Sequence, residues 1–377
     1  MKVLQIVPGV DEHGAGPSIS VPMLCRSLKN YADVELILLG QVHPVLADIK
    51  CKAFPIKSFP SRILGRSPAM FSYIQSQAQE LDIICTNSLW MMPNIYQEKA
   101  RRGSRAKSVV MPRGTLSSAA LRYSRWKKFL VWHLGGQKQT LRNADMFVAT
   151  CEEEYRDIRT CGFRQPVAII PNGVDIPKSR ADITSQSERT LLFLSRIHKH
   201  KGVELLLRSW RNIMELYPEW KLKIVGSLET PYARNIVELS RSLGCQRVTF
   251  PGELLGEKKA KAFQEASCFI LPTCGENFGI AIAEALSFGV PVITTQGAPW
   301  SGLGAHQAGW WVKQSDIESA MHEALSMSRT QLAEYGMRGA EWMKEDYSWE
   351  EVAIKTMEAY EYILSPANRI PDCVRVD

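Results

Sequence analysis

Two glutamates eight positions apart, Glu276 and Glu284, mark the segment of the chain best suited to chemistry. On one continuous helix, residues eight apart lie about 12 Å apart along the axis. We therefore place Glu276 in a loop and Glu284 within the helix that follows it. Backbone N–H groups from Phe278 through Gly279 to Ile280 would then form the helix N-terminus, which is a ready binding site for a phosphate.

The two carboxylates lie on either side of this expected anion site. A carboxylate accepts hydrogen bonds from hydroxyl groups, so Glu284 could hold a ribose and Glu276 a sugar. Glu284 is surrounded by alanine, isoleucine and leucine, and a carboxylate in such surroundings needs a partner. The alternative interpretation is an ordinary acid before the helix and another on its polar face.

Two cations, Arg196 and Lys201, follow the apolar run 191–194. Doubly wound folds bind ligands at the carboxyl edge of the sheet, where both cations would lie. Arginine through its fork and lysine as a point charge can neutralise a diphosphate and stabilise it as a leaving group. Alone they would be ordinary surface charges. Next to a helix that begins at Gly279, they indicate a diphosphate site.

Gly14 and Gly16 connect an apolar run at 3–7 to a helical pattern that begins near Ile19. Glycines at such a place let backbone N–H groups approach an anion at a helix N-terminus. A simple turn between strand and helix explains them equally well. Their order also departs from the dinucleotide-binding fingerprint GxGxxG.

The elements that position these residues follow from two series of apolar, β-branched runs separated by helical patterns. The first series lies at 3–7, 34–39, 83–85, 108–111, 146–149 and 167–170, and the second at 191–194, 222–225, 248–250, 268–271 and 290–293. Such alternation predicts an α/β fold with two doubly wound parallel sheets. Turn formers at 171–177 place the boundary, giving domains 1–175 and 176–348. An amphipathic helix from Trp349 to Tyr362 belongs to a segment 349–377 that we expect to pack back on the first domain.

Composition narrows the class of protein. Hydrophobic residues make up 45% of the 377, a globular value, and the nine cysteines include no CxxC pair, which predicts reduced thiols and no structural zinc. No apolar run reaches the roughly 18 to 20 residues that span a bilayer, so a cytoplasmic protein is expected. The formal charge of +7 suits an anionic partner.

A basic and aromatic stretch at 122–142 reads RYSRWKKFLVWHLGGQKQTLR. It could lie on the anionic inner face of the plasma membrane, with cations over the headgroups and aromatic rings at the interface. It could equally be an amphipathic helix that packs its aromatic side chains into the first domain. Nucleic acid is not expected, because no recognition motif accompanies the cations.

Taken together, these motifs resemble the retaining glycosyltransferases of family 4 over nearly the whole chain. The resemblance rests on Glu276 with Glu284, Arg196 with Lys201-Gly202, Pro171-Asn172-Gly173-Val174-Asp175 and Gly14-Ala15-Gly16. It implies a GT-B architecture, in which two Rossmann-like domains face each other across a cleft, with the donor on the second and the acceptor on the first. The segments 112–116 and 297–300 further resemble a branch common in bacterial polysaccharide, lipopolysaccharide and O-antigen synthesis.

The resemblance also implies roles for individual residues. Arg196 and Lys201 would hold the donor diphosphate, Glu284 the ribose and Glu276 the transferred sugar. The other residues it places at the donor are Asn277, Phe278, Gly279, Ile280 and Gly16. Many relatives carry a histidine where this chain has Arg113, and a guanidinium cannot act as a general base. Arg113 is therefore expected to bind phosphate or acceptor, together with Gly14 and Asn172.

These expectations amount to an α-forming hexosyltransferase that needs no cofactor and no metal, since no DxD pattern is found. A UDP-sugar is favoured as donor and GDP-mannose comes second. The expected acceptor is a saccharide, carried on a polyprenyl diphosphate. Two other functions remain open at this point: a sugar-nucleotide epimerase of the same architecture, and a silent nucleotide-binding partner of another transferase.

Overall fold

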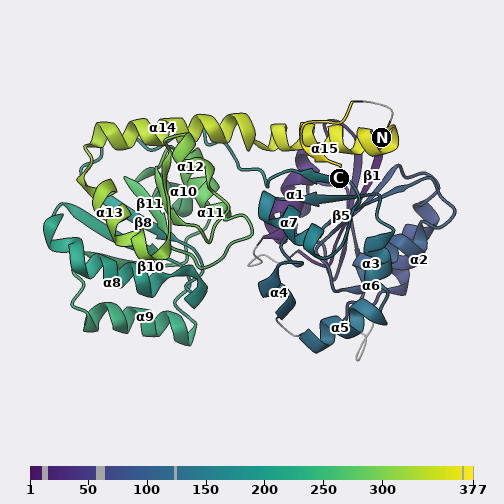
Figure 1. Ribbon diagram of the computed structural model, residues 1–377, viewed down its shortest axis with the longest axis horizontal. Helices are drawn as coiled ribbons and strands as arrows, with labels where there is room; N and C mark the ends of the chain where they lie inside the picture. Colours follow the sequence, from purple (N-terminus) through teal and green to yellow (C-terminus); the bar gives the residue numbers. More distant parts are fainter. Residues whose placement is uncertain (11–15, 57–63, 123–124, 367–368, 377) are drawn as a thin grey trace. The chain divides into compact units, whose positions relative to one another are not determined.

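The computed structural model describes residues 1–10, 16–56, 64–122, 125–366 and 369–376. The chain divides into two compact units (Figure 1). The first contains Met1–Gly173 and Trp349–Asp377, and the second contains Val174–Ser348. The division thus falls within the predicted turn-rich segment 171–177, and the C-terminal segment belongs to the first unit.

The described part of the first unit contains an eight-stranded sheet in the order β14-β7-β6-β5-β4-β1-β2-β3. All neighbouring strands are parallel except β14, which runs antiparallel to β7. The strands are β1 (Lys2–Val7), β2 (Asp33–Leu39), β3 (Cys51–Phe54), β4 (Ile83–Asn87), β5 (Lys107–Met111), β6 (Met146–Ala149), β7 (Val167–Ile169) and β14 (Val374–Arg375). The strand order reverses direction between β1 and β4, and this switch point is where doubly wound sheets bind ligands.

Helices cover both faces of this sheet. They are α1 (Pro17–Leu28), α2 (Pro68–Gln77), α3 (Met92–Ala100), α4 (Ser118–Arg122), α5 (Arg125–His133), α6 (Gln137–Arg142), α7 (Glu152–Thr160) and α15 (Trp349–Leu364). One apolar core joins α1 and α15 to β1, β2 and β4. On the other face α2 and α3 share a core with the same strands, and α7 packs near β6 and β7.

The second unit repeats this plan with a six-stranded parallel sheet in the order β10-β9-β8-β11-β12-β13. Its strands are β8 (Arg189–Leu194), β9 (Trp220–Val225), β10 (Val248–Gly252), β11 (Cys268–Leu271), β12 (Val292–Thr295) and β13 (Gly309–Val312). Its α-helices are α8 (Val203–Ile213), α9 (Pro231–Ser242), α10 (Gly256–Gln264), α11 (Ile280–Ser287), α12 (Gly302–Ala305), α13 (Ile317–Ser326) and α14 (Arg329–Asp346). The switch point lies between β8 and β11.

The predicted strands are all present, and the α/β class with two doubly wound sheets is confirmed. The sequence reasoning did not find β3, β13 and β14, which lie at or near sheet edges. All nine cysteines are free thiols, as predicted, although only Cys25, Cys85 and Cys268 are core residues and Cys274 is exposed. Among the described residues, no helix is both long and apolar enough to cross a membrane.

Candidate functional site

The loop that carries Lys201 is fastened to the loop that follows β11. Gly202 has a φ of +72°, and a Cβ atom there would lie 1.9 Å from the carbonyl oxygen of Pro272. The carbonyl of His200 accepts hydrogen bonds from the Thr273 hydroxyl at 2.9 Å and from the Cys274 N–H at 2.7 Å. Only glycine permits this approach, so the Lys201-Gly202 pair places its lysine at the switch point.

Lys201 and Glu276 meet there as an ion pair, and both side chains are mostly buried. The backbone N–H of Glu276 donates to the Gly297 carbonyl at 2.8 Å, which fixes the loop before α11. Arg196 lies in the loop after β8 and is exposed. Within the described part of the chain it makes no hydrogen bond or ion pair, so its guanidinium is available to an anion.

Helix α11 begins as the sequence predicted, with Glu276 before it and Glu284 inside it. Gly279 has a φ of +84°, and its carbonyl accepts from the N–H groups of Ile282 and Ala283 at 2.8 and 3.4 Å. No side chain caps this end and its first turn carries no acid. The N–H groups of Ile280 and Ala281 have no partner among the described residues. This end of the helix is therefore open to an anion.

A cluster of aromatic side chains holds this helix end in place. The Trp300 indole N–H donates to the Phe278 carbonyl at 2.5 Å, and the two rings lie 5.3 Å apart. Trp300 in turn contacts Tyr347 and Trp342, with centroids 5.3 and 5.6 Å away. Trp300, which belongs to segment 297–300, therefore supports the N-terminal end of α11. Asn277, between Glu276 and Phe278, is half-buried and makes contacts of its own.

Glu284 is paired with Lys259, a residue of α10 that the sequence reasoning did not find. The Lys259 ammonium lies 2.6 Å from one carboxylate oxygen of Glu284. Burial raises the pKa of the Glu284 carboxyl, the Lys259 charge opposes that rise, and Asp175 adds to it. The second carboxylate oxygen of Glu284 can accept another hydrogen bond.

In the first unit, Arg113 follows β5 with a φ of +52° and stands among neutral partners. Its guanidinium donates to Asn87 at 2.9 Å, to the Ser20 hydroxyl at 3.1 Å and to Asn172 at 2.7 Å. None of the described carboxylates forms an ion pair with it. Burial lowers the pKa of Arg113, which nevertheless stays charged at neutral pH. The positive charge is thus held in place by neutral hydrogen-bond partners, and the nearby Glu154 carboxylate acts on it without forming an ion pair.

Arg113 is positioned by a chain of buried side chains. Asn87 at the end of β4 donates to Gln5 of β1 at 3.0 Å, and Gln5 donates to the Tyr360 hydroxyl of α15 at 3.0 Å. Two further residues after β4, Ser88 and Trp90, have positive φ angles of 66° and 77°. Backbone strain of this kind gathers at binding and catalytic sites, and here it lies beside the switch point of the first sheet.

Gly16 lies close to Arg113. It is the N-cap of α1, and its carbonyl accepts from the N–H and the hydroxyl of Ser20, the residue that also contacts Arg113. The structure thus brings Gly16, Arg113 and Asn172 together in the first unit. Gly14 lies outside the described residues. In the second unit it brings Lys201 and Glu276 together just before α11, with Glu284 one turn into that helix and Arg196 on the loop between β8 and Lys201.

Two parallel sheets of Rossmann type in one chain, each with polar residues at its switch point, define the GT-B class of fold. The family model described as Glycosyltransferase Family 4 matches residues 16–178, and that described as Glycosyl transferases group 1 matches residues 175–337. The chain belongs to glycosyltransferase family 4. The predicted family and fold are therefore confirmed.

Similar proteins were found by sequence and by structure. The D-inositol 3-phosphate glycosyltransferase of Corynebacterium urealyticum is 26% identical over 269 residues, which are 62% of this chain and 62% of that protein. Sucrose-phosphate synthase of Thermosynechococcus elongatus superposes with a TM-score of 0.73 at 20% identity, over 97% of this chain and 99% of that one. An Anabaena protein solved with UDP and glucose gives a TM-score of 0.76 at 16% identity, over 96% and 99%. The chain matches 42% to 62% of the length of the first curated relatives, and the structural likeness concerns the fold.

Proposed function

We propose that this protein transfers a hexose from a nucleotide diphosphate donor to an acceptor hydroxyl, with retention of the anomeric configuration and without a metal ion. One arrangement carries the proposal: Lys201 and Glu276 form an ion pair just before the open N-terminus of α11, and Arg196 lies on the loop that follows β8 at the same switch point. Two cations and free backbone N–H groups are the donor set that a diphosphate leaving group requires.

Lys201 has a double task in this proposal. A lysine ammonium carries three protons, so Lys201 can hold Glu276 and a phosphate oxygen at once. Arg196 would contact the diphosphate through its guanidinium. Ile280 and Ala281 would contact it through their backbone N–H groups at the start of α11. Together they supply the charge that other transferases take from a divalent cation, and we therefore propose that none is needed.

Glu284 would bind the ribose of the donor. One of its oxygens is occupied by Lys259 at 2.6 Å, and the other is left to accept from a ribose hydroxyl. UDP is the favoured nucleotide, in keeping with the UDP complex of the Anabaena protein. GDP remains the second choice, because Glu284 would contact the ribose, which UDP and GDP share, and not the base.

The route by which the anomeric configuration is retained follows from the chemistry assigned to Glu276. A double displacement needs a free carboxylate as nucleophile. Glu276 is instead ion-paired to Lys201, which stabilises the carboxylate and makes it a poor nucleophile. We therefore propose transfer on one face of the sugar. The bond from the anomeric carbon to the phosphate oxygen breaks, the acceptor oxygen bonds to that carbon from the same side, and the acceptor proton passes to the departing phosphate.

The acceptor would bind to the first unit, at Arg113. A guanidinium with only neutral partners attracts an anionic group, and Ser20 and Asn172 beside it are suited to orient a phosphate or its neighbouring hydroxyls. The name of the Corynebacterium relative specifies a phosphorylated acceptor, inositol 3-phosphate. We propose a saccharide acceptor that carries phosphate, such as a polyprenyl diphosphate-linked saccharide of cell-surface polysaccharide synthesis.

Nucleotide binding in a chelator tests the donor site. Thermal unfolding is measured in EDTA with UDP, GDP, ADP and UDP-glucose, since a ligand at 100 times its Kd stabilises a fold by about 2.7 kcal/mol. UDP is expected to give the largest shift among the free nucleotides, and Arg196→Ala to reduce it while Arg234→Ala, an exposed arginine on α9, leaves it unchanged. A shift that appears only after Mg²⁺ or Mn²⁺ is added would contradict the proposal.

A further inference from the structure

The positive charge of this protein is concentrated in one segment. Residues 99–144 contain 12 of the 46 lysines and arginines and none of the 39 acidic residues. Outside this segment the acidic residues are in the majority, although the whole chain carries a formal charge of +7. The segment includes α4, α5 and α6 of the first unit.

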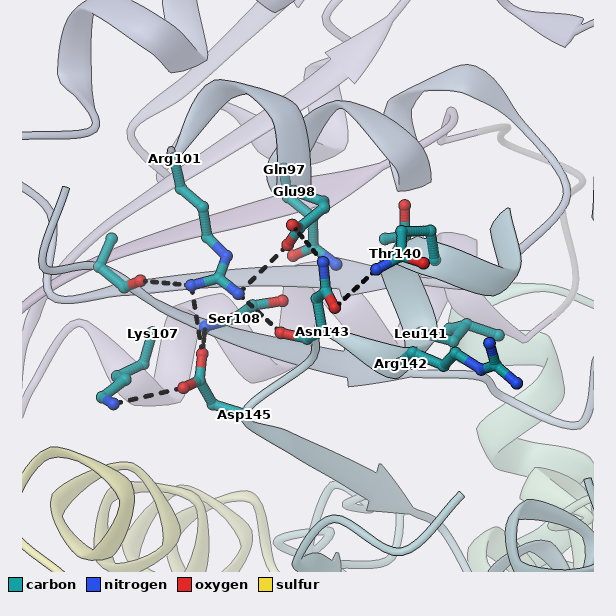
Figure 2. A network of polar contacts seen from close by, with 12 residues as sticks. Gln97, Glu98, Arg101, Lys107, Ser108, Thr140, Leu141, Arg142, Asn143 and Asp145 are labelled. Atoms are coloured by element: carbon teal, nitrogen blue, oxygen red, sulfur yellow. Dashed lines mark hydrogen bonds and ion pairs between the residues drawn. The ribbon is translucent and has the colours of Figure 1, made fainter. Parts of the chain in front are cut away.

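The structure separates the cations of this segment into two groups. Some of those near its start are neutralised: Arg101 pairs with Glu98 and Asp145, as Figure 2 shows, and Lys107 pairs with Asp145 at 3.3 Å. The second group has no carboxylate partner among the described residues. Around α5 it includes Arg122, Lys127, Lys138 and Arg142, and Figure 2 draws no contact to the guanidinium of Arg142.

Helix α5 lies in the middle of this second group and turns its apolar side chains outward. Trp126, Phe129, Leu130 and Leu134, just after the helix, have exposed fractions of 66%, 60%, 43% and 81%. Positions 126, 130 and 134 follow one another at four-residue spacing, so they form a single stripe. A surface helix of a globular protein normally buries such a stripe. Figure 1 shows α5 at the edge of the first unit, beside α6 and away from α15.

The inward side of α5 is already satisfied by contacts within the unit. The Trp132 ring packs 5.8 Å from Trp90 and 6.0 Å from Phe163. Lys128 donates to the Ala120 carbonyl, and its ammonium lies 5.3 Å from the Trp90 ring. Burial lowers the pKa of Lys128. The exposed stripe is therefore a second apolar face of α5, separate from the face that packs into the first unit.

We propose that α5 is a membrane anchor: the stripe of Trp126, Phe129, Leu130 and Leu134 enters the headgroup region of an anionic phospholipid bilayer, and Arg122, Lys127, Lys138 and Arg142 contact the lipid phosphates. Exposed aliphatic and aromatic side chains flanked by cations suit such an interface. Leucines gain little from a nucleic-acid backbone, and a second copy of this chain would bring a surface of the same charge. The anchor acts independently of the proposed transferase chemistry.

Vesicle sedimentation tests the anchor. The full chain is mixed with vesicles of phosphatidylcholine alone or with added phosphatidylglycerol, and we expect binding to the anionic vesicles that weakens with salt. The double variant Arg122→Glu, Lys127→Glu should lower the partition coefficient at least about 25-fold, because each cation near the surface contributes about fivefold. Lys344→Glu, an exposed cation in the second unit, is the matched control and should bind as the wild type does.

The apolar stripe needs a separate test, since cations alone would only adsorb to the surface. Trp126→Ser with Leu134→Ser should reduce binding at least tenfold at the same net charge, whereas Leu216→Ser, whose leucine is 65% exposed in the second unit, should not. Quenching of tryptophan fluorescence by brominated lipid should be lost in Trp126→Phe. Unaltered melting temperatures would show that the variants fold. Equal binding by the stripe variant, equal binding to neutral vesicles, or dimerisation through the stripe in light scattering would overturn the proposal.

Discussion

Lys201 and Glu276 form an ion pair at the carboxyl ends of β8 and β11, although 75 residues separate them in the chain. The pair depends on Gly202, where a side chain would collide with the Pro272 carbonyl. Because the ammonium has protons to spare, the pair can persist when a diphosphate binds. The two residues are therefore expected to act as one unit.

Removal of Lys201 should harm donor binding in two ways. Lys201→Ala deletes a charge-assisted contact to the diphosphate and leaves the Glu276 carboxylate facing that anion. UDP affinity, measured by calorimetry, is expected to fall about 10- to 100-fold. In the double variant Lys201→Ala, Glu276→Gln, part of the loss should be recovered, because the repulsion is gone. Lys199→Ala, two residues away and exposed, serves as the control. Additive effects of the two substitutions would show that the pair does not couple to the ligand.

Donor binding should weaken at low pH, because Glu284 then takes up a proton. Burial raises the pKa of this carboxyl, so it takes up a proton at a higher pH than an ordinary glutamate. The protonated form can no longer accept as a carboxylate from a ribose hydroxyl. UDP affinity should therefore fall as the pH drops through that raised pKa. The Glu284→Gln variant should bind UDP more weakly at every pH and should lose this part of the pH dependence. The pH dependence that remains in the variant reports the titration of UDP itself. Identical pH profiles would remove Glu284 from the ribose site.

Arg113 should matter for the acceptor and not for the donor. Arg113→Gln keeps a hydrogen-bonding side chain but removes the charge, which forms no ion pair with a described carboxylate. We expect the thermal shift with UDP to stay the same and that with myo-inositol 3-phosphate to disappear. Arg26→Gln is the control, because that arginine already pairs with Asp48 at 2.9 Å. Loss of the UDP shift alone would assign Arg113 to the donor.

Arg101 should contribute strongly to stability. Its side chain is 18% exposed and that of Glu98 is 10% exposed, and it also donates to the Asn143 carbonyl at 2.7 Å (Figure 2). Loss of one member of a buried pair costs about 3–5 kcal/mol, so Arg101→Met should lower the urea midpoint of the first unit markedly. Arg241→Met breaks a pair whose side chains are 71% and 69% exposed, and should cost less than about 1 kcal/mol. Equal losses of stability in Arg101→Met and Arg241→Met would contradict the burial of the Arg101–Glu98 pair.

The sequence predicted the parts of this structure that local patterns determine. Buried runs marked the central strands, and the eight-residue spacing from Glu276 to Glu284 located the start of α11. The edge strand β3 escaped notice because only part of it is buried, so its pattern is weak. Lys259 escaped because α10 carries three lysines, and nothing local tells which one turns toward Glu284. Likewise, Asn87 and Ser20 lie far from Arg113 in the sequence, and only the tertiary fold brings them into contact with it.

The anomeric configuration of a transfer product tests the central claim most directly. The protein is incubated in EDTA with a UDP-α-hexose, such as UDP-glucose, in methanol–water, so that methanol replaces the natural acceptor and gives a glycoside that cannot mutarotate. Proton NMR then distinguishes the two anomers by the coupling of the anomeric proton. Transfer on one face of the sugar predicts methyl α-glucoside, with Lys201→Ala strongly impaired. Methyl β-glucoside would show inversion and contradict the mechanism proposed for Glu276, Lys201 and the departing diphosphate.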